Sequence, residues 1–158
     1  MMEPNIARWA TASLAVLLKP IIAAAVPTGL GLQFFVEGVD REQKAWFQQD
    51  SAVLRVTGPT PSFGAGQIIY RFEAMVMLTD LVDDAENGFK NHDRLGTIAN
   101  ALCNPIPVFA YGDGDAQVGC LDIDSKAKDF IRIVQFGKID KDSEVVQGAV
   151  IVKYEICL

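Results

Sequence analysis

The sequence predicts an α+β fold: a mostly antiparallel β-sheet with an N-terminal helix and a central helix packed on one face. Two long segments, residues 67–80 and 145–158, place apolar side chains at every second position, as β-strands do. Helical spacing of apolar residues occurs in only two places, far apart in the sequence, which is typical of α+β domains. The chain has 158 residues, 50% of them hydrophobic, so we expect a single domain over residues 1–158.

The first helix is expected over about residues 4–25, with a kink or break where Pro20 removes a backbone donor. The same stretch has some features of a signal peptide, with three alanines near a cleavage position. Lys19 and Pro20 divide it into apolar pieces that are too short to span a bilayer, which takes about 20 residues. We therefore expect a retained helix and no membrane association, with one packing stripe: Ile6, Trp9, Ala10, Ser13, Leu14, Leu17, Leu18 and Ile21.

The next segments predict two short strands and a loop before the first long strand. We expect strands over residues 32–36 and 52–57, with Trp46 and Phe47 docking the polar connection between them onto the core. Residues 58–66 are rich in proline and glycine, and proline cannot donate a hydrogen bond to a β-ladder. This region is therefore predicted as a loop.

The second half of the chain predicts a helix followed by strands. An acidic turn at residues 83–88 leads to Asn91, which we expect to cap a helix that ends before Pro105. Short strands are expected over residues 106–111, 118–123 and 130–136, and a charged loop over 137–144 precedes the last strand. The helix is predicted from the spacing of its apolar residues: Leu95, Ile98, Ala99 and Leu102.

Charge and hydropathy limit the function. The formal net charge of −6 is opposite to the basic surface that binding to nucleic acid phosphates requires, so we expect no tight DNA or RNA binding. The mean hydropathy of +0.21 is high for a soluble monomer, and the two long strands exceed the usual length of about 5–6 residues. Both features favour a subunit whose apolar surface is covered by other subunits.

An acidic segment and the cysteines have simple structural interpretations. Asp113, Gln117 and Asp124 match part of a calcium-loop template, but Val118 replaces the glycine that the template needs. A turn between two short strands explains this segment better. Three cysteines without a close pair indicate a reducing compartment, and Cys157 is interpreted as a strand residue rather than a nucleophile.

Other possible chemical motifs are equally weak. His92 and Asp93 are neighbours, so on a helix they diverge and cannot face one site. The glycines around Leu30 lack the rest of a dinucleotide fingerprint, and Met75 and Met77 are interpreted as packing residues. We expect no enzyme activity, no catalytic residues, no cofactor and no metal.

The order of elements resembles the tail terminator proteins of long-tailed bacteriophages, also called tail completion or neck proteins. The segments that carry the likeness are FFVEG (34–38), VLRVTGP (53–59), YRFEAMVM (70–77), LGTIANAL (95–102) and the closing residues 150–158. The resemblance implies a virion protein, assembled in the host cytoplasm as a homo-oligomeric, usually hexameric, ring. Such a ring caps the tail tube protein and joins it to the head–tail connector protein, and DNA passes through its lumen without specific binding.

Loops at strand ends are the expected contact points of such a ring. We assign contacts with the tube or the connector to the loops at 58–66 and 137–144, and the candidate interaction residues are Pro59, Pro61, Phe63, Lys138, Asp140, Lys141 and Asp142. Three alternatives stay open: another head–tail connector or tail tube subunit, an exported ligand-binding domain, and a small hydrolase or isomerase.

Overall fold

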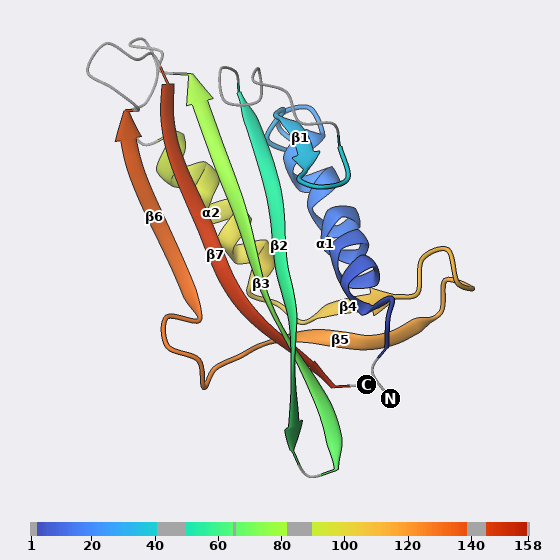
Figure 1. Cartoon of the computed structure of the whole chain (residues 1–158). Coiled ribbons are helices and arrows are strands. Elements are labelled where there is room, and N and C mark those ends of the chain that lie inside the picture. Colours follow the sequence, from blue (N-terminus) through green and yellow to red (C-terminus); the bar gives the residue numbers. More distant parts are fainter. Residues whose placement is uncertain (1–2, 41–49, 65, 82–89, 139–144, 158) are drawn as a thin grey trace.

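The computed structural model describes residues 3–40, 50–64, 66–81, 90–138 and 145–157. Within these ranges two helices and seven strands follow one another along the chain (Figure 1). They are α1 (Ile6–Ala23), β1 (Gln33–Val36), β2 (Ser51–Gly64), β3 (Gln67–Leu81), α2 (Lys90–Leu102), β4 (Ile106–Phe109), β5 (Gln117–Ile123), β6 (Ile131–Lys138) and β7 (Val145–Cys157).

All seven strands belong to one curled sheet in which β7 is central. The order is β1-β2-β3-β7-β5-β4, and β6 also pairs with β7. Along one edge β7 pairs with β3 from Val145 to Cys157, so β5 and β6 share its other edge. Only β1 and β2 run parallel; the other described pairings are antiparallel. The predicted α+β fold with a mostly antiparallel sheet is confirmed.

In the view of Figure 1, α2 lies behind β7 and β3, and α1 lies beside β2, next to β1; both helices pack into the core on one face of the sheet. The alternation predicted for the long strands decides which side chains meet the helices. On β3 and β7 the buried residues of the covered face are Tyr70, Phe72, Ala74, Val76, Leu78, Val150, Val152, Tyr154 and Ile156. They form a continuous core with the helices.

The helix α1 packs through a stripe close to the predicted one. Leu14, Leu18 and Ile22 are fully buried, whereas Leu17 and Ile21 are only partly buried. Of the kink or break expected at Pro20, the break is wrong, because α1 continues through Pro20 to Ala23. By length and composition α1 is apolar enough to cross a membrane, yet seven of its 18 residues are buried within this fold.

The turn between β4 and β5 contacts the beginning of α1 through Asp113. Asp113, placed in a turn by the sequence analysis, accepts a hydrogen bond from the indole Nε1 of Trp9 at 2.9 Å and pairs with the guanidinium of Arg8. Asp113 is 104 residues away from Trp9 in the sequence. The acidic turn residue therefore has a structural partner that sequence spacing did not suggest.

The helix α2 lies very close to β7 because Gly148 has no side chain. A Cβ at this position would lie 2.6 Å from Cδ1 of Leu95 and 3.2 Å from the carbonyl oxygen of Val134. At the other end of the helix, the Tyr154 hydroxyl donates a hydrogen bond to the Leu102 carbonyl at 2.6 Å. Two contacts therefore fix α2 against the same strand.

The predicted cap of α2 is wrong. The helix begins at Lys90, so Asn91 lies within its first turn rather than before it. The Asn91 amide donates instead to the buried carboxylate of Asp80 at 2.8 Å, and Arg94 pairs with that carboxylate as well. The tertiary partner on β3 outweighs the local capping preference. The expected docking residues Trp46 and Phe47 and the acidic turn at 83–88 lie outside the described residues.

Candidate functional site: a projecting arm and an apolar groove

The segment predicted as a loop at residues 58–66 is the main correction to the sequence analysis. The strand β2 continues to Gly64 and pairs with β3 up to Gly64↔Gln67. These two strand ends, residues 59–64 and 67–69, form an arm that projects below the body in Figure 1 and is two-stranded beyond Ile69, where β7 ends at Cys157. Part of the unusual length of β3 therefore lies in this arm.

The arm accepts two prolines because of a bulge and a free edge. The register of β2 on β3 shifts between Thr57 and Thr60, so Gly58 and Pro59 lie in the irregular part, and Pro61 pairs opposite Tyr70. The described part of β1 pairs with residues 51–54 only, which leaves β3 as the single partner of the arm's β2 segment. Bulges and edge strands are where a sheet tolerates proline.

Glycine is required where the arm leaves the body. Gly58 has a φ of +116°, a conformation that side chains rarely adopt. A Cβ there would lie 2.7 Å from the carbonyl oxygen of Arg71 on the paired strand. The glycine that suggested a loop in the sequence therefore permits a bulged strand.

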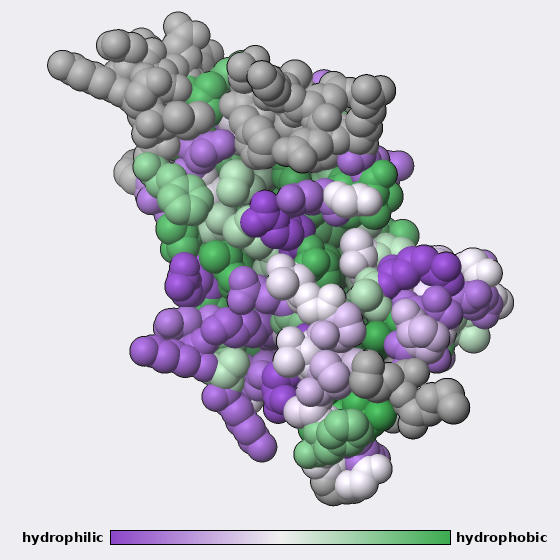
Figure 2. Space-filling view, in the orientation of Figure 1, coloured by the Kyte–Doolittle hydropathy of each residue, from purple (hydrophilic) through white to green (hydrophobic). Residues whose placement is uncertain are grey.

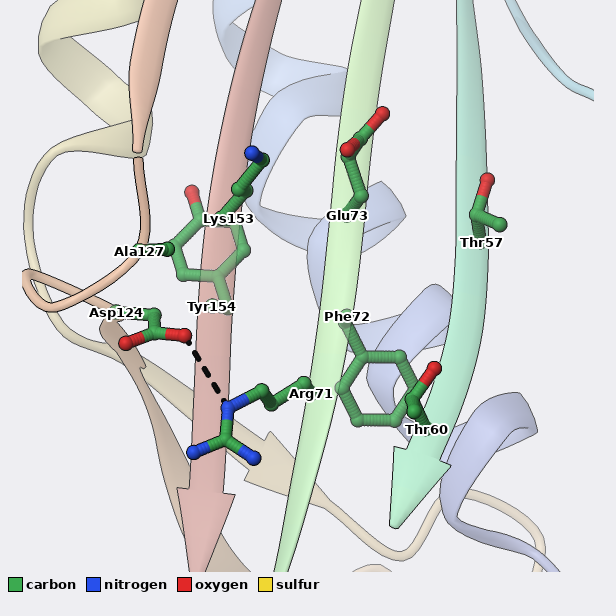
Figure 3. A pocket seen from close by; sticks show the side chains of 9 residues that line it. All are labelled: Thr57, Thr60, Arg71, Phe72, Glu73, Asp124, Ala127, Lys153 and Tyr154. Atoms are coloured by element: carbon green, nitrogen blue, oxygen red, sulfur yellow. Dashed lines mark hydrogen bonds and ion pairs between the residues drawn. The ribbon is translucent and has the colours of Figure 1, made fainter. Parts of the chain in front are cut away.

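A pocket of about 290 Å³ lies at the base of the arm (Figure 3). Within it Arg71 of β3 points toward Asp124, and its Nε lies 3.3 Å from the Asp124 carboxylate. The Asp124 side chain is only 7% exposed, and Arg71 also donates to the hydroxyl of Ser62 in the arm. One guanidinium therefore joins both strands of the arm to the turn after β5.

The chemistry of this pocket supports an anchoring role. None of the residues that line it within the described part of the chain is a serine, cysteine or histidine. Lys153 donates from Nζ to the Lys128 carbonyl at 2.7 Å, and burial raises the pKa of the Tyr154 phenol above its ordinary value, with a smaller contribution from Cys103. The lysine already has a partner and the phenol stays protonated, so the geometry favours fixing the arm over proton transfer.

The arm surface is apolar and uncharged. Phe63 is 79% exposed, which makes it the most exposed large hydrophobic side chain of the described residues. The sequence from Gly58 to Tyr70 holds no Asp, Glu, Lys or Arg. Figure 2 shows hydrophobic surface at the lower end of the molecule, where the arm projects. An exposed aromatic residue on an uncharged projection is typical of a contact surface.

A second apolar feature is a groove of about 580 Å³ between α1 and the turn after β1. Ala7, Thr11 and Ala15 line it from the helix, and Val36 and Val39 line it from the strand and turn. Val39 is 74% exposed. We call this feature the α1 groove.

A third apolar area is the face of the sheet turned away from the helices. Opposite register positions place Val53, Met77 and Ala149 in one row, where Val53 and Ala149 are buried, and Met75 and Ile151 in the next, between Arg55 and Arg132. Neither α1 nor α2 lies over this face (Figure 1). The partly exposed methionines, interpreted as packing residues, are therefore also surface residues.

Of the remaining predicted interaction residues, the structure places Lys138 at the opposite end of the sheet. Lys138 is the last residue of β6, paired with Val146, so the strand is longer than predicted and takes in the first two residues of the expected loop. Asp140, Lys141 and Asp142 lie outside the described residues. The structure therefore places Pro59, Pro61 and Phe63 together on the arm, far along β2 and β3 from Lys138.

Within the described ranges, no three His, Cys, Asp or Glu side chains come together as a metal site. The two cysteines whose side chains are described, Cys103 and Cys120, are free. Burial and the nearby Asp122 carboxylate raise the pKa of the Cys120 thiol, which opposes thiolate formation. No known family model matches the chain, and no curated protein matches it.

Proposed function

We propose that this chain is the structural subunit of a bacteriophage tail terminator, a ring that caps the tail tube and joins it to the head connector. The arm is the observation that carries this proposal. Burying an aromatic side chain such as Phe63 is worth about 1.5–3 kcal/mol, and a monomer forgoes that gain by holding it in water. A subunit that buries Phe63 against a partner during assembly gains this free energy.

The positions of the arm and the α1 groove support a ring. They are different surfaces of one chain, so a contact between them is head-to-tail rather than self-complementary. Head-to-tail contacts close into a ring or continue as a filament, depending on the rotation between subunits. The resemblance to tail terminators supports closure with six copies.

The negative charge suits a ring that encloses DNA. At −6 per chain, six copies carry a large negative charge, and a channel with this charge repels phosphates. DNA would then pass without binding, and the work of the protein would be contact rather than catalysis.

Native mass spectrometry and negative-stain electron microscopy of the purified chain test the ring. We expect a closed oligomer of six copies that increases with protein concentration. If the protein is monomeric at its highest soluble concentration and absent from rings in virions that contain it, the proposal is wrong.

The position of the chain within a virion tests the specific role. Gold labelling of a tagged subunit should mark the junction between the head connector and the tail tube. Label along the whole tail would identify a tube subunit, and label on the head side of the junction would identify a connector.

A further inference from the structure

We infer that the arm of each copy occupies the α1 groove of the neighbouring copy, with Phe63 as its anchor. This inference rests on the proposed ring and names the contact that builds it. It also changes the partner expected from the sequence, which assigned the arm to the tube or the connector. The reasons lie in the charge, the position and the stiffness of the two surfaces.

Among the described residues that line the groove, none offers an unpaired charge to an incoming segment. Its two charged lining residues, Arg8 and Glu37, are each paired within the chain, Arg8 with Asp113 and Glu37 with Arg55. The Thr11 hydroxyl donates to the Ala7 carbonyl at 2.8 Å, so it too has a partner. The groove therefore suits a neutral, apolar occupant.

The arm is such an occupant. It carries no charge between Gly58 and Tyr70, and Pro61, Phe63 and Ile68 give it an apolar surface. Two copies with a net charge of −6 each repel one another, so a contact between uncharged surfaces costs least. The arm and the groove meet this condition on both sides of the contact.

An arm cannot fill the groove of its own chain. The groove lies beside β1, which pairs with residues 51–54 at the start of β2, whereas the arm begins at residue 59 and extends away from that end. Figure 1 shows β1 at the upper end of the sheet and the arm at the lower end. An arm that occupies this groove therefore belongs to another copy.

The arm is also held ready for binding. Arg71 links Ser62 in the arm to the buried carboxylate of Asp124 in the body. Fixing a segment in its bound direction reduces the entropy lost on association. A stiff arm can therefore use the small contact area of its tip efficiently.

Cross-linking between two differently labelled copies tests the inference. In a background with serine at Cys103, Cys120 and Cys157, one protein carries Gly64→Cys, next to Phe63, and a second carries Val39→Cys in the groove. A Cβ at Gly64 makes only an ordinary contact of 3.9 Å, so this change keeps the arm and its aromatic residue. The two proteins are mixed and treated with a short bismaleimide.

Val26→Cys is the matched control, because Val26 is 72% exposed, against 74% for Val39, and does not line the groove. We expect the cross-linked dimer with Val39→Cys to exceed that with Val26→Cys several-fold. Adding Phe63→Ser to the Gly64→Cys protein should remove that excess.

Equal yields with both partners overturn the inference. If the unmodified chain forms rings while the Val39→Cys product stays at the control level, the arm lies elsewhere and the proposed function stands. If neither rings nor the specific product form, both proposals fail. In assembled particles, Gly64→Cys could instead cross-link to a tube or connector protein and not to Val39→Cys. That result would overturn the inference and show that the arm contacts the partner expected from the sequence.

Discussion

The strand β3 passes through two environments that differ in what covers them. Between Tyr70 and Leu78 every second side chain is buried beneath the helices, whereas at the arm tip Phe63, on the paired strand, is 79% exposed. The β2–β3 pairing continues through both parts. The comparison shows that backbone pairing alone can extend a strand, and that the helices and β7 decide which part becomes core and which stays available for contact. Changes in the body should therefore affect folding, and changes in the arm should affect association.

The largest expected effect is in the body. Leu14 is fully buried on α1, so Leu14→Ala should lower the free energy of unfolding by about 2–5 kcal/mol. Leu17→Ala, at a partly buried position of the same helix, should cost less. Chemical denaturation of both variants measures the difference. Equal losses would show that the two leucines pack equally well.

One substitution made in both regions sharpens the comparison. Gly148→Ala places a methyl group 2.6 Å from the fully buried Leu95 and should destabilise the fold by about 1–3 kcal/mol. Gly64→Ala in the arm meets nothing closer than 3.9 Å and should leave stability nearly unchanged. Thermal unfolding of the two variants provides the measurement. A larger loss for Gly64→Ala would contradict the assignment of body and arm.

A smaller effect is expected at Tyr154. Tyr154→Phe removes the donor to the Leu102 carbonyl and should cost about 1 kcal/mol. Because burial raises the folded-state pKa of this phenol, its stabilising contribution is complete below the ordinary value of about 10 and declines as the pH rises toward the folded-state pKa. The stability difference between the wild type and Tyr154→Phe should therefore shrink above about pH 10. Denaturation at a series of pH values measures this difference. A stability difference that stayed constant into strong alkali would contradict a buried phenol.

The smallest effect on folding is expected at the arm tip. Phe63→Ser should change the free energy of unfolding by less than about 0.5 kcal/mol, since surface substitutions rarely do more. It should nevertheless abolish the oligomer seen by analytical ultracentrifugation. Val26→Ser, at another exposed apolar position, serves as the control. A Phe63→Ser protein that assembles like the wild type would remove the arm from the interface.

Much of the fold could be predicted from periodicity, because burial on one face leaves a repeat in the sequence. The strands β3 and β7 and both helices were found in this way, with ends correct to within a few residues, whereas β2 extends seven residues beyond its predicted end at residue 57. The parallel pairing of β1 and β2, the shared edge of β7 and the contact of Trp9 with Asp113 could not be predicted. Each depends on residues distant in the sequence, for which a single chain gives no spacing rule.

The sequence predicted which residues belong to the candidate site but not their secondary structure. Pro59, Pro61 and Phe63 were singled out as loop residues, and they belong to a β-arm. The rule that proline interrupts a ladder holds for central strands, and the sequence does not reveal that this segment has a free edge. The α1 groove was missed because Val39, in a turn, and Ala7, on a helix, come together only in the folded chain.

The buried carboxylate of Asp80 has a consequence for how β3 finds its alignment. From Met75 to Leu78 the strand is apolar on both faces, so a shift of one residue would still present hydrophobic side chains to the helices. Such a shift would turn Asp80 away from Asn91 and Arg94 and leave the buried Asn91 amide without this partner. At this apolar end of the strand one acidic residue thus fixes the alignment, as Arg71 and Glu73, which alternate with the buried Phe72 and Ala74, fix it at the other end.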